Sequence, residues 1–408
     1  MKYIKKAIFL FTLFIAYIYT LAINAIPENI ILFQNEKLNI STIYGLNINT
    51  NTNKRTSILT SSVTDFKETG RYNLNISLFD IFKVKDVTVD VVENVSVVPV
   101  GKLAGLKLYT HGVMVVGMTE ITGQDGQKHK PHENTGIQEG DIILKANENT
   151  LNNSDELTQY INETKGNEMI LTCLREQETF EIKITPIKTI SGGYKIGLWV
   201  RDSAAGVGTV TFYNPETKLF GALGHGIVDI DTEKLIDIQS GEFVTTRIIN
   251  IIKGTNGEPG KIQGTVDNQK TIGKIYSNTI FGIYGELSDE KALDINKYNI
   301  IPVASRNDIQ TGSAKILCSL ENGETQEFDI EIKKLYLNNN SNNKSMLIKV
   351  TDERLINATG GIIQGMSGCP IIQNGKFIGA ITNVLVSDPT TGYAVFADMM
   401  IKELNMIK

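Results

Sequence analysis

The chain has 408 residues, of which 41% are hydrophobic, and only three are cysteines. This length allows two or three domains, and the apolar content is that of globular proteins, which excludes a largely disordered chain. Because the formal net charge is −5 and the lysines and arginines are dispersed, the composition also excludes a basic nucleic-acid-binding protein.

The N-terminus carries a membrane segment. Three lysines within the first six residues precede 20 residues without a charge, from Ala7 to Ile26. A segment of this length can cross a bilayer, so residues 1–26 are either a signal peptide or an anchor whose lysines stay in the cytoplasm. The sequence ending at Ala25 fits a small-x-small cleavage site only in part, which favours the anchor. We therefore expect the rest of the chain to lie across a membrane.

Residues 27–100 are rich in Asn, Thr, Ser and β-branched residues. Runs such as "YNLNISLF" alternate in polarity, which is typical of strands with one buried face. This segment predicts a small β-rich domain, and no side chains in it suggest catalysis.

Residues 101–188 contain the motif "GIQEGDIILKANENTL", followed by a helix that we expect to begin near Ser154 or Asp155 and by a closing hairpin. The motif and the order of these elements resemble a PDZ domain. The resemblance implies that a partner peptide binds as an added edge strand, with its carboxylate held by backbone amides. The loop implied is "THGVMVV", at His111, Gly112 and Val113, although its sequence differs from the usual Gly-Leu-Gly-Phe.

No cofactor or metal site is predicted. His129 and His132 in "HKPH" have no acidic or cysteine partner at ligand spacing, which favours a solvated loop. Cys173, Cys318 and Cys369 are widely and irregularly spaced, which fits neither a disulfide framework nor a CxxC metal site. We expect buried small side chains or free thiols.

Residues 189–408 contain many short runs typical of strands, separated by turn signals, and one internal helix, "DERLINATG". The pattern predicts an all-β barrel or sandwich. In "GALGHG", glycines on both sides leave the imidazole of His225 unobstructed, and histidine is the usual base for a hydroxyl nucleophile.

The second glycine motif of this region, "GMSGCPIIQNGKFIGA", surrounds Ser367. Gly365 and Gly368 permit backbone torsions that bring amides beside the serine hydroxyl, as an oxyanion hole requires. The turn "QNGK" predicts a hairpin that fixes this loop to a core. The residues alone leave two interpretations open: a paired nucleophile and base, or two unrelated glycine turns.

A resemblance connects the two motifs. "GMSGCP", the hairpin and "GYAVFADMM" resemble the nucleophile region of chymotrypsin-like serine proteases. With the membrane segment, the PDZ-like segment, "GALGHG" and "KVTDERLINATGGIIQG", the chain resembles the stage IV sporulation protein B peptidases of endospore formers. This resemblance implies a mainly β chain with a chymotrypsin-like domain at 189–408. It also implies a catalytic triad of His225, Asp352 and Ser367, with the amides of Gly365 and Ser367 as oxyanion hole.

Asp352 has a structural alternative. It or Thr351 can cap the helix that follows, and Gly360 can end that helix. Asp229 and Asp231, which are the acids nearest to His225 in sequence, are rival orienting groups.

The chain differs from chymotrypsin in two ways. Met366 occupies the position of the acid that receives a newly cut N-terminus, so activation cannot follow that route. Asp352 lies only 15 residues before Ser367, whereas chymotrypsin's aspartate is far upstream. Cys369 is a rival nucleophile, but its position suits a small packing residue.

The resemblance implies a sporulation-specific serine endopeptidase. Such an enzyme cleaves itself between Ile26 and about Gly101 and is released into the space between the membranes around the forespore. It then cuts a regulatory membrane protein, bound through the PDZ domain, that controls an intramembrane protease and so a mother-cell sigma factor. Two alternatives are a catalytically silent PDZ scaffold of the envelope and a non-proteolytic ester or amide hydrolase.

Overall fold

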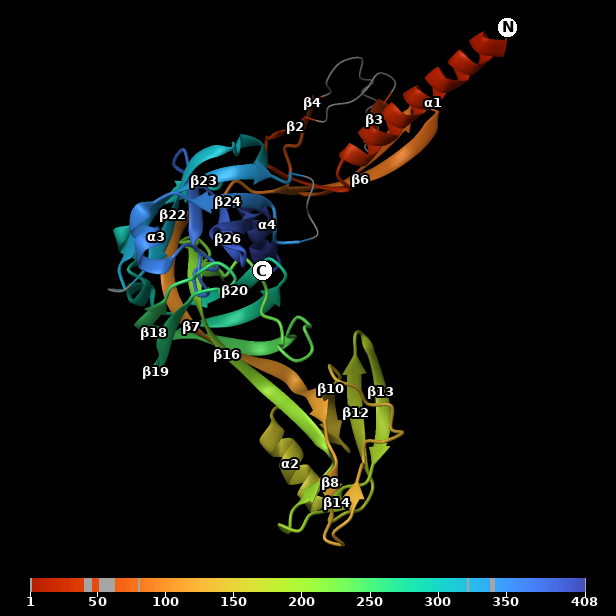
Figure 1. The fold of residues 1–408 in the computed structure, drawn as a ribbon, viewed down its shortest axis with the longest axis vertical. Helices are drawn as coiled ribbons and strands as arrows, with labels where there is room; N and C mark the ends of the chain where they lie inside the picture. Colours follow the sequence, from red (N-terminus) through yellow and green to blue (C-terminus); the bar gives the residue numbers. More distant parts are fainter. Residues whose placement is uncertain are drawn as a thin grey trace.

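The computed structural model describes residues 2–39, 46–50, 63–79, 81–320, 323–337 and 342–407. Strands predominate, which confirms the prediction of a mainly β chain. Figure 1 shows three parts in a row: a helix with a small sheet, a central β body, and a lobe that contains the second helix.

Helix α1 (Lys2–Ala25) projects from the body (Figure 1). Its segment Tyr3–Asn24 is long and apolar enough to cross a membrane, and the window that passes this test is not buried by the rest of the chain. This agrees with the predicted anchor or signal sequence. At its C-terminal end, Tyr19 and Ile23 pack against the core of the small sheet.

The small sheet follows α1 and has the strand order β1-β6-β5-β3. Its strands and the adjoining pair are β1 (Asn29–Phe33), β2 (Lys37–Asn39), β3 (Leu46–Thr50), β4 (Val63–Asp65), β5 (Gly70–Leu78) and β6 (Phe82–Val92). Ile31 and Phe33 pack into the core of the central body. Asp90 accepts a hydrogen bond of 2.5 Å from Lys402 near the C-terminus. The small sheet is therefore docked on the central body and not merely linked to it.

Two long strands, β7 (Ser96–Met118) and β16 (Leu198–Tyr213), pair with each other and run from the central body into the lobe. We name residues 111–201 the α2 lobe. Its other elements are β8 (Ile121–Thr122), β9 (Lys128–His129), β10 (Ile142–Ala146), β11 (Asn149–Thr150), α2 (Ser154–Glu163), β12 (Met169–Arg175), β13 (Glu178–Ile184), β14 (Ile187–Lys188) and β15 (Tyr194–Lys195). Helix α2 begins where expected, with Asn153 as its cap. The lobe's core extends from Val113 to Val200, so the first residues of β16, beyond the predicted segment 101–188, complete it.

The central body has two β units. The first continues the sheet of β7 and β16 with β17 (Leu219–Ala222), β20 (Gly282–Leu287), β19 (Lys261–Thr279) and β18 (Ile238–Ile252). The second is a closed barrel of β22 (Gly312–Ser319), β23 (Thr325–Leu335), β24 (Met346–Val350), β27 (Asp388–Phe396), β26 (Lys376–Leu385) and β25 (Pro370–Gln373). Short elements between them are the 3-10 helices Glu290–Leu293, Ile295–Lys297 and Arg306–Asp308, and β21 (Ile301–Pro302).

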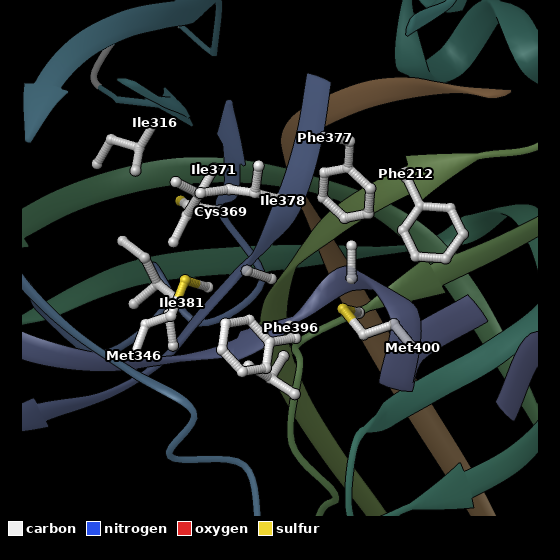
Figure 2. Close-up of a cluster of buried hydrophobic side chains, with 14 of the residues drawn as sticks. Phe212, Ile316, Met346, Cys369, Ile371, Phe377, Ile378, Ile381, Phe396 and Met400 are labelled. Carbon is white, nitrogen blue, oxygen red and sulfur yellow. The ribbon is translucent and has the colours of Figure 1, made fainter. Parts of the chain in front are cut away.

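The two β units share one apolar core. Figure 2 shows Phe212 of β16 beside Phe377 of the barrel, and their ring centroids are 5.3 Å apart. Met400 of helix α4 (Ala397–Asn405), which the sequence analysis did not predict, enters the same core next to Phe396 (Figure 2). This shared core fixes the first sheet against the barrel, and His225 and Ser367 come from opposite sides of that contact.

Two local predictions in the barrel are confirmed. Helix α3 (Glu353–Thr359) is capped by Asp352 and ends at Gly360, whose φ is 78°. The "QNGK" turn joins β25 to β26, with Asn374 and Gly375 both at positive φ, as a tight hairpin needs.

Candidate active site

The loop between α3 and β25 presents Ser367. Gly365 and Gly368 have φ of 102° and 95°, a region that favours glycine. A Cβ at Gly368 would lie 2.3 Å from the Thr209 carbonyl oxygen and 2.6 Å from the Leu223 amide nitrogen. Only glycine therefore allows the serine loop to lie directly on the segment that leads to His225.

His225 follows strand β17 through a tight turn in which Leu223 and Gly224 both have positive φ. A Cβ at Gly224 would meet Val395 at 3.1 Å and Thr382 at 3.2 Å, so the turn packs on the barrel strands β27 and β26. The first β unit thus supplies the histidine at its contact with the barrel.

Two threonines hold both motifs in one place. The Thr209 hydroxyl donates to the Gly365 carbonyl at 2.7 Å, and the Thr209 amide donates to the Ser367 carbonyl at 3.2 Å. The Thr209 carbonyl accepts from the Leu223 amide at 3.1 Å. The Ser367 hydroxyl donates to the carbonyl of Thr382 at 2.8 Å, and Thr382 is also the residue on which Gly224 packs. The structure therefore brings together the two motifs that the sequence left as separate possibilities.

Some backbone amides of the serine loop donate hydrogen bonds within the protein, and others do not. The Met366 amide donates to Ile363, and the Gly368 amide donates to Ile381. Within the described part of the chain, the amides of Gly365 and Ser367 donate no hydrogen bond. These are the two amides predicted for the oxyanion hole, and both remain available to an incoming oxygen.

The His225 ring is suited to act as a base. Its Nδ1 lies 2.8 Å from the Gly226 carbonyl oxygen, so Nδ1 carries the proton and Nε2 is left as the acceptor. Burial lowers the pKa of His225 below its usual 6.5, and the hydrogen bond to the Gly226 carbonyl opposes this only in part. The ring is therefore neutral at neutral pH.

The structure does not bring Asp352 into hydrogen-bond contact with His225. Its Oδ1 accepts from the backbone and side chain of Arg354, and its Oδ2 accepts from Arg354 and from the Asp329 amide. Arg354 is the main cause that lowers the pKa of Asp352 to about 2. Asp352 caps α3, which leads into the serine loop, and its orienting role stays a prediction.

The rival acids Asp229 and Asp231 are also engaged elsewhere. Both carboxylates accept hydrogen bonds from the Arg201 guanidinium, that of Asp231 at 2.8 Å. Asp229 is buried, and its second oxygen accepts from the Asp231 and Thr232 amides. The two acids thus tie the loop after His225 to strand β16 of the α2 lobe.

The predicted peptide-binding residues of the α2 lobe do not line its groove. His111 faces Asp237 at 3.6 Å, while Val113 is buried and pairs with Ile143 of β10. Gly112 packs so closely on β10 that a Cβ would lie 2.4 Å from the Ile143 carbonyl oxygen. Gly112 and Val113 therefore belong to the contact between β7 and β10, and the structure places none of the three residues in the groove.

The groove of the α2 lobe has a volume of about 770 Å³ and lies between α2 and the first residues of β16. It is lined on the strand side by Ile190, Tyr194, Ile196, Gly197, Leu198 and Trp199. Residues 198–201 pair with β7 on one side only, because β17 joins β16 no earlier than Val210. The groove therefore has an open strand edge beside a helix. The sequence analysis did not consider the triplet Ile196-Gly197-Leu198, whose glycine between two apolar residues could have indicated this groove.

The remaining candidates have local roles. His129 lies 2.9 Å from Asp125, and no group of three or more potential metal ligands occurs among the described residues. All three cysteines are buried and unoxidised in the structure. Met366 is buried in the core of the central body, and its neutral thioether has no charge with which to pair with a newly cut N-terminus.

Comparisons with known proteins identify the family. A family model described as SpoIVB peptidase S55 matches residues 192–401, just over half of the chain. The chain belongs to this peptidase family. It is therefore a serine peptidase, as the sequence predicted, and the matched range includes His225, Asp352 and Ser367.

No curated protein matches the chain. Among solved structures, the inactive form of the Rv3671c protease is similar at 13% identity, with a TM-score of 0.29, over 49% of this chain and 84% of that one. A serine-to-alanine mutant of Rv3671c from M. tuberculosis H37Rv, also inactive, gives 12% identity, a TM-score of 0.28, and coverage of 50% and 83%.

Proposed function

We propose that this peptidase is a membrane-anchored sporulation endopeptidase that cleaves itself and then a regulatory membrane protein, in the space between the membranes around the forespore. The observation that supports the chemistry best is the serine loop itself. The amides of Gly365 and of Ser367 itself have no acceptor within the described part of the chain, and the loop that carries them packs against the turn that carries His225. The signalling role, which ends in activation of a mother-cell sigma factor through an intramembrane protease, rests on the family.

The proposed reaction is acyl transfer. The Ser367 hydroxyl leaves the Thr382 carbonyl, gives its proton to Nε2 of His225, and attacks the scissile carbonyl carbon. The Gly365 and Ser367 amides donate to the oxygen that becomes negative. His225 then returns the proton to the leaving amine. In the second half of the reaction, water gives a proton to His225 and attacks the acyl carbon, and the acid product leaves as His225 returns the proton to Ser367. In the proposed triad, Asp352 supplies the negative charge that favours the imidazolium.

The lowered pKa of His225 predicts a pH dependence. The base must be neutral, and burial keeps it neutral at lower pH than a solvated histidine. We expect the rate of labelling by a fluorophosphonate to reach half of its maximum at a pH below 6.5. Labelling stopped at set times and followed by mass spectrometry of the intact protein measures this rate. A half-maximal pH at or above 6.5 would contradict the lowered pKa of His225.

Self-cleavage is proposed for the segment between Ile26 and about Gly101. Ile26 itself is buried, and its carbonyl accepts from Lys85 at 2.6 Å, so it does not suit entry into an active site. The turn Lys67–Gly70 and the link at Glu93 and Asn94 are exposed. Exposed turns are the usual sites of proteolysis, which favours these two stretches.

The α2 lobe is proposed to hold the partner protein. An extended peptide fits the open edge of β16, where it would gain main-chain hydrogen bonds, while its side chains enter the groove beside α2. Ile196-Gly197-Leu198 is an apolar-glycine-apolar triplet that leads into this strand, as the carboxylate-binding loop of a PDZ domain leads into the strand that pairs with the peptide. We therefore propose the start of β16, and not His111, as the recognition site.

A variant of the groove tests this role. Trp199 lines the groove with its side chain 64% exposed and rests on Gly117, so Trp199→Ala removes contact area without opening the core. We expect the kcat/KM for a protein substrate to fall about tenfold, because tryptophan is a common anchor of interfaces. Labelling of Ser367 by a fluorophosphonate should be unchanged. Ile249→Ala, an equally exposed apolar site on β18, is the control. Equal losses with substrate and probe would show that the lobe only supports the fold.

A further inference from the structure

The barrel core places two cysteines opposite each other. Strands β22 and β25 are antiparallel, with Lys315 opposite Ile372 and Ile316 opposite Ile371. Cys369 directly precedes β25, and the same register continued for two residues beyond the pair Ile316–Ile371 would place Cys318 opposite it. The strand alternation gives both the same orientation as Ile316 and Ile371, toward the barrel core, and Figure 2 shows Cys369 next to Ile371 there.

The two thiols have no strong partner that would hold them apart. The sulfur of Cys318 lies 3.8 Å from the Ser319 carbonyl oxygen, and that of Cys369 lies 3.9 Å from the Thr209 hydroxyl. Burial is the main cause that raises the pKa of the Cys369 thiol, and the neighbouring Cys318 thiol raises it further. Cys173 lies in the separate core of the α2 lobe and does not compete.

We propose that Cys318 and Cys369 are a modification site: a disulfide between them, made by exchange with a small-molecule disulfide such as oxidised glutathione, locks the Ser367 loop to β22. Directly opposed residues of antiparallel strands have Cα atoms about 4.5–5.5 Å apart, within the range that a disulfide spans. In the exchange, the two thiols lose two protons and two electrons, and glutathione disulfide becomes two thiols by way of a mixed disulfide.

The position of the bond determines what it does. Cys369 follows Ser367 by two residues, and its amide and carbonyl already hold Met366 and Ile381. The closed loop would contain β23, β24, α3 and Ser367, so the bond restricts the unfolded chain over the whole nucleophile region. Because both thiols are buried in the folded state, a reagent in solution reaches them slowly there. The bond therefore forms while the chain folds, and export would bring the unfolded chain to an oxidant.

The full chain refolded in detergent with a glutathione redox buffer tests the proposal. After unfolding, a thiol reagent should count one free thiol instead of three, and a non-reducing digest should contain a peptide pair that joins Cys318 to Cys369. The oxidised protein should melt roughly 5–10 °C above the same protein refolded with dithiothreitol. Fluorophosphonate labelling should be retained, because the loop's backbone bonds exist without the disulfide.

Three variants make the result decisive. Cys318→Ala should abolish the linked peptide pair and the gain in melting temperature, and Cys369→Ala should do the same. Cys173→Ala should change neither. If one of the barrel variants does not fold, the other and the wild-type digest still decide. Three free thiols after oxidative refolding, or a bond that includes Cys173, would overturn the proposal.

Discussion

Ser367→Ala is expected to abolish fluorophosphonate labelling and to lower substrate cleavage at least about ten-thousand-fold. In the proposed mechanism the hydroxyl forms the acyl bond, and without it the variant keeps only the polarising effect of the Gly365 and Ser367 amides. Mass spectrometry of the N-termini reports on self-processing in the same sample. The wild-type chain should show a new N-terminus between Ile26 and about Gly101, and the variant should keep its own.

The fold should survive this substitution. The Ser367 hydroxyl makes one hydrogen bond, to the Thr382 carbonyl, and loss of one such bond costs about 1 kcal/mol. Ser319→Ala is the control, because the buried Ser319 hydroxyl of β22 donates to the Gly101 carbonyl of β7 and also contacts the Thr325 hydroxyl, and none of these groups belongs to the proposed site. The control should lose at least as much stability and keep full labelling. Self-processing of Ser367→Ala at the wild-type rate would show that another residue is the nucleophile.

The same measurements separate the alternative functions. A silent scaffold has no activated serine, so the wild-type chain itself would resist the probe. A non-proteolytic hydrolase would be labelled and would turn over small esters, but its N-terminus would stay intact. Only the proposed endopeptidase combines labelling with a new N-terminus that depends on Ser367.

The structure also shows why some features could be predicted from the sequence and others could not. The Ser367 loop and the α3 helix depend on local rules, namely glycines at positive φ and an aspartate cap, which short motifs reveal. Helix α4 was missed because its cap position is Phe396, which makes no side-chain capping bond, and because a strand precedes it directly. Its stability comes from burial of residues such as Met400, which only the tertiary structure shows.

The groove of the α2 lobe could not be located from the sequence for a topological reason. The strand that borders it, the start of β16, lies after the lobe's closing hairpin in sequence, and it is brought beside α2 only because β16 pairs with β7. The chain order expected of a PDZ domain indicates His111 and Gly112 instead. Likewise, sequence distance could not show that Asp229 and Asp231 pair with Arg201.

Asp352→Asn is expected to lower the single-turnover cleavage rate at least about a hundredfold, if Asp352 orients His225 as the family resemblance implies. With a pKa of about 2, the carboxylate is ionised at any pH suited to assay, whereas asparagine is neutral. Some stability should also be lost. Both oxygens accept hydrogen bonds, and an Asn side chain would turn its NH₂ group toward a donor, the Asp329 amide or Arg354. The rate must therefore be measured well below the melting temperature of the variant.

Arg354→Met is the control that separates orientation from anchoring. It removes the guanidinium that holds Asp352, and so weakens the start of α3, but leaves the carboxylate in place. If Asp352 acts on His225, this variant should be destabilised yet cleave at close to the wild-type rate, while Asp352→Asn is nearly inactive. Equal losses in both would mean that Asp352 only anchors α3 and that the Gly226 carbonyl orients the ring. A large loss of cleavage rate in Asp229→Asn, together with a near-normal rate in Asp352→Asn, would assign the orienting role to the loop after His225.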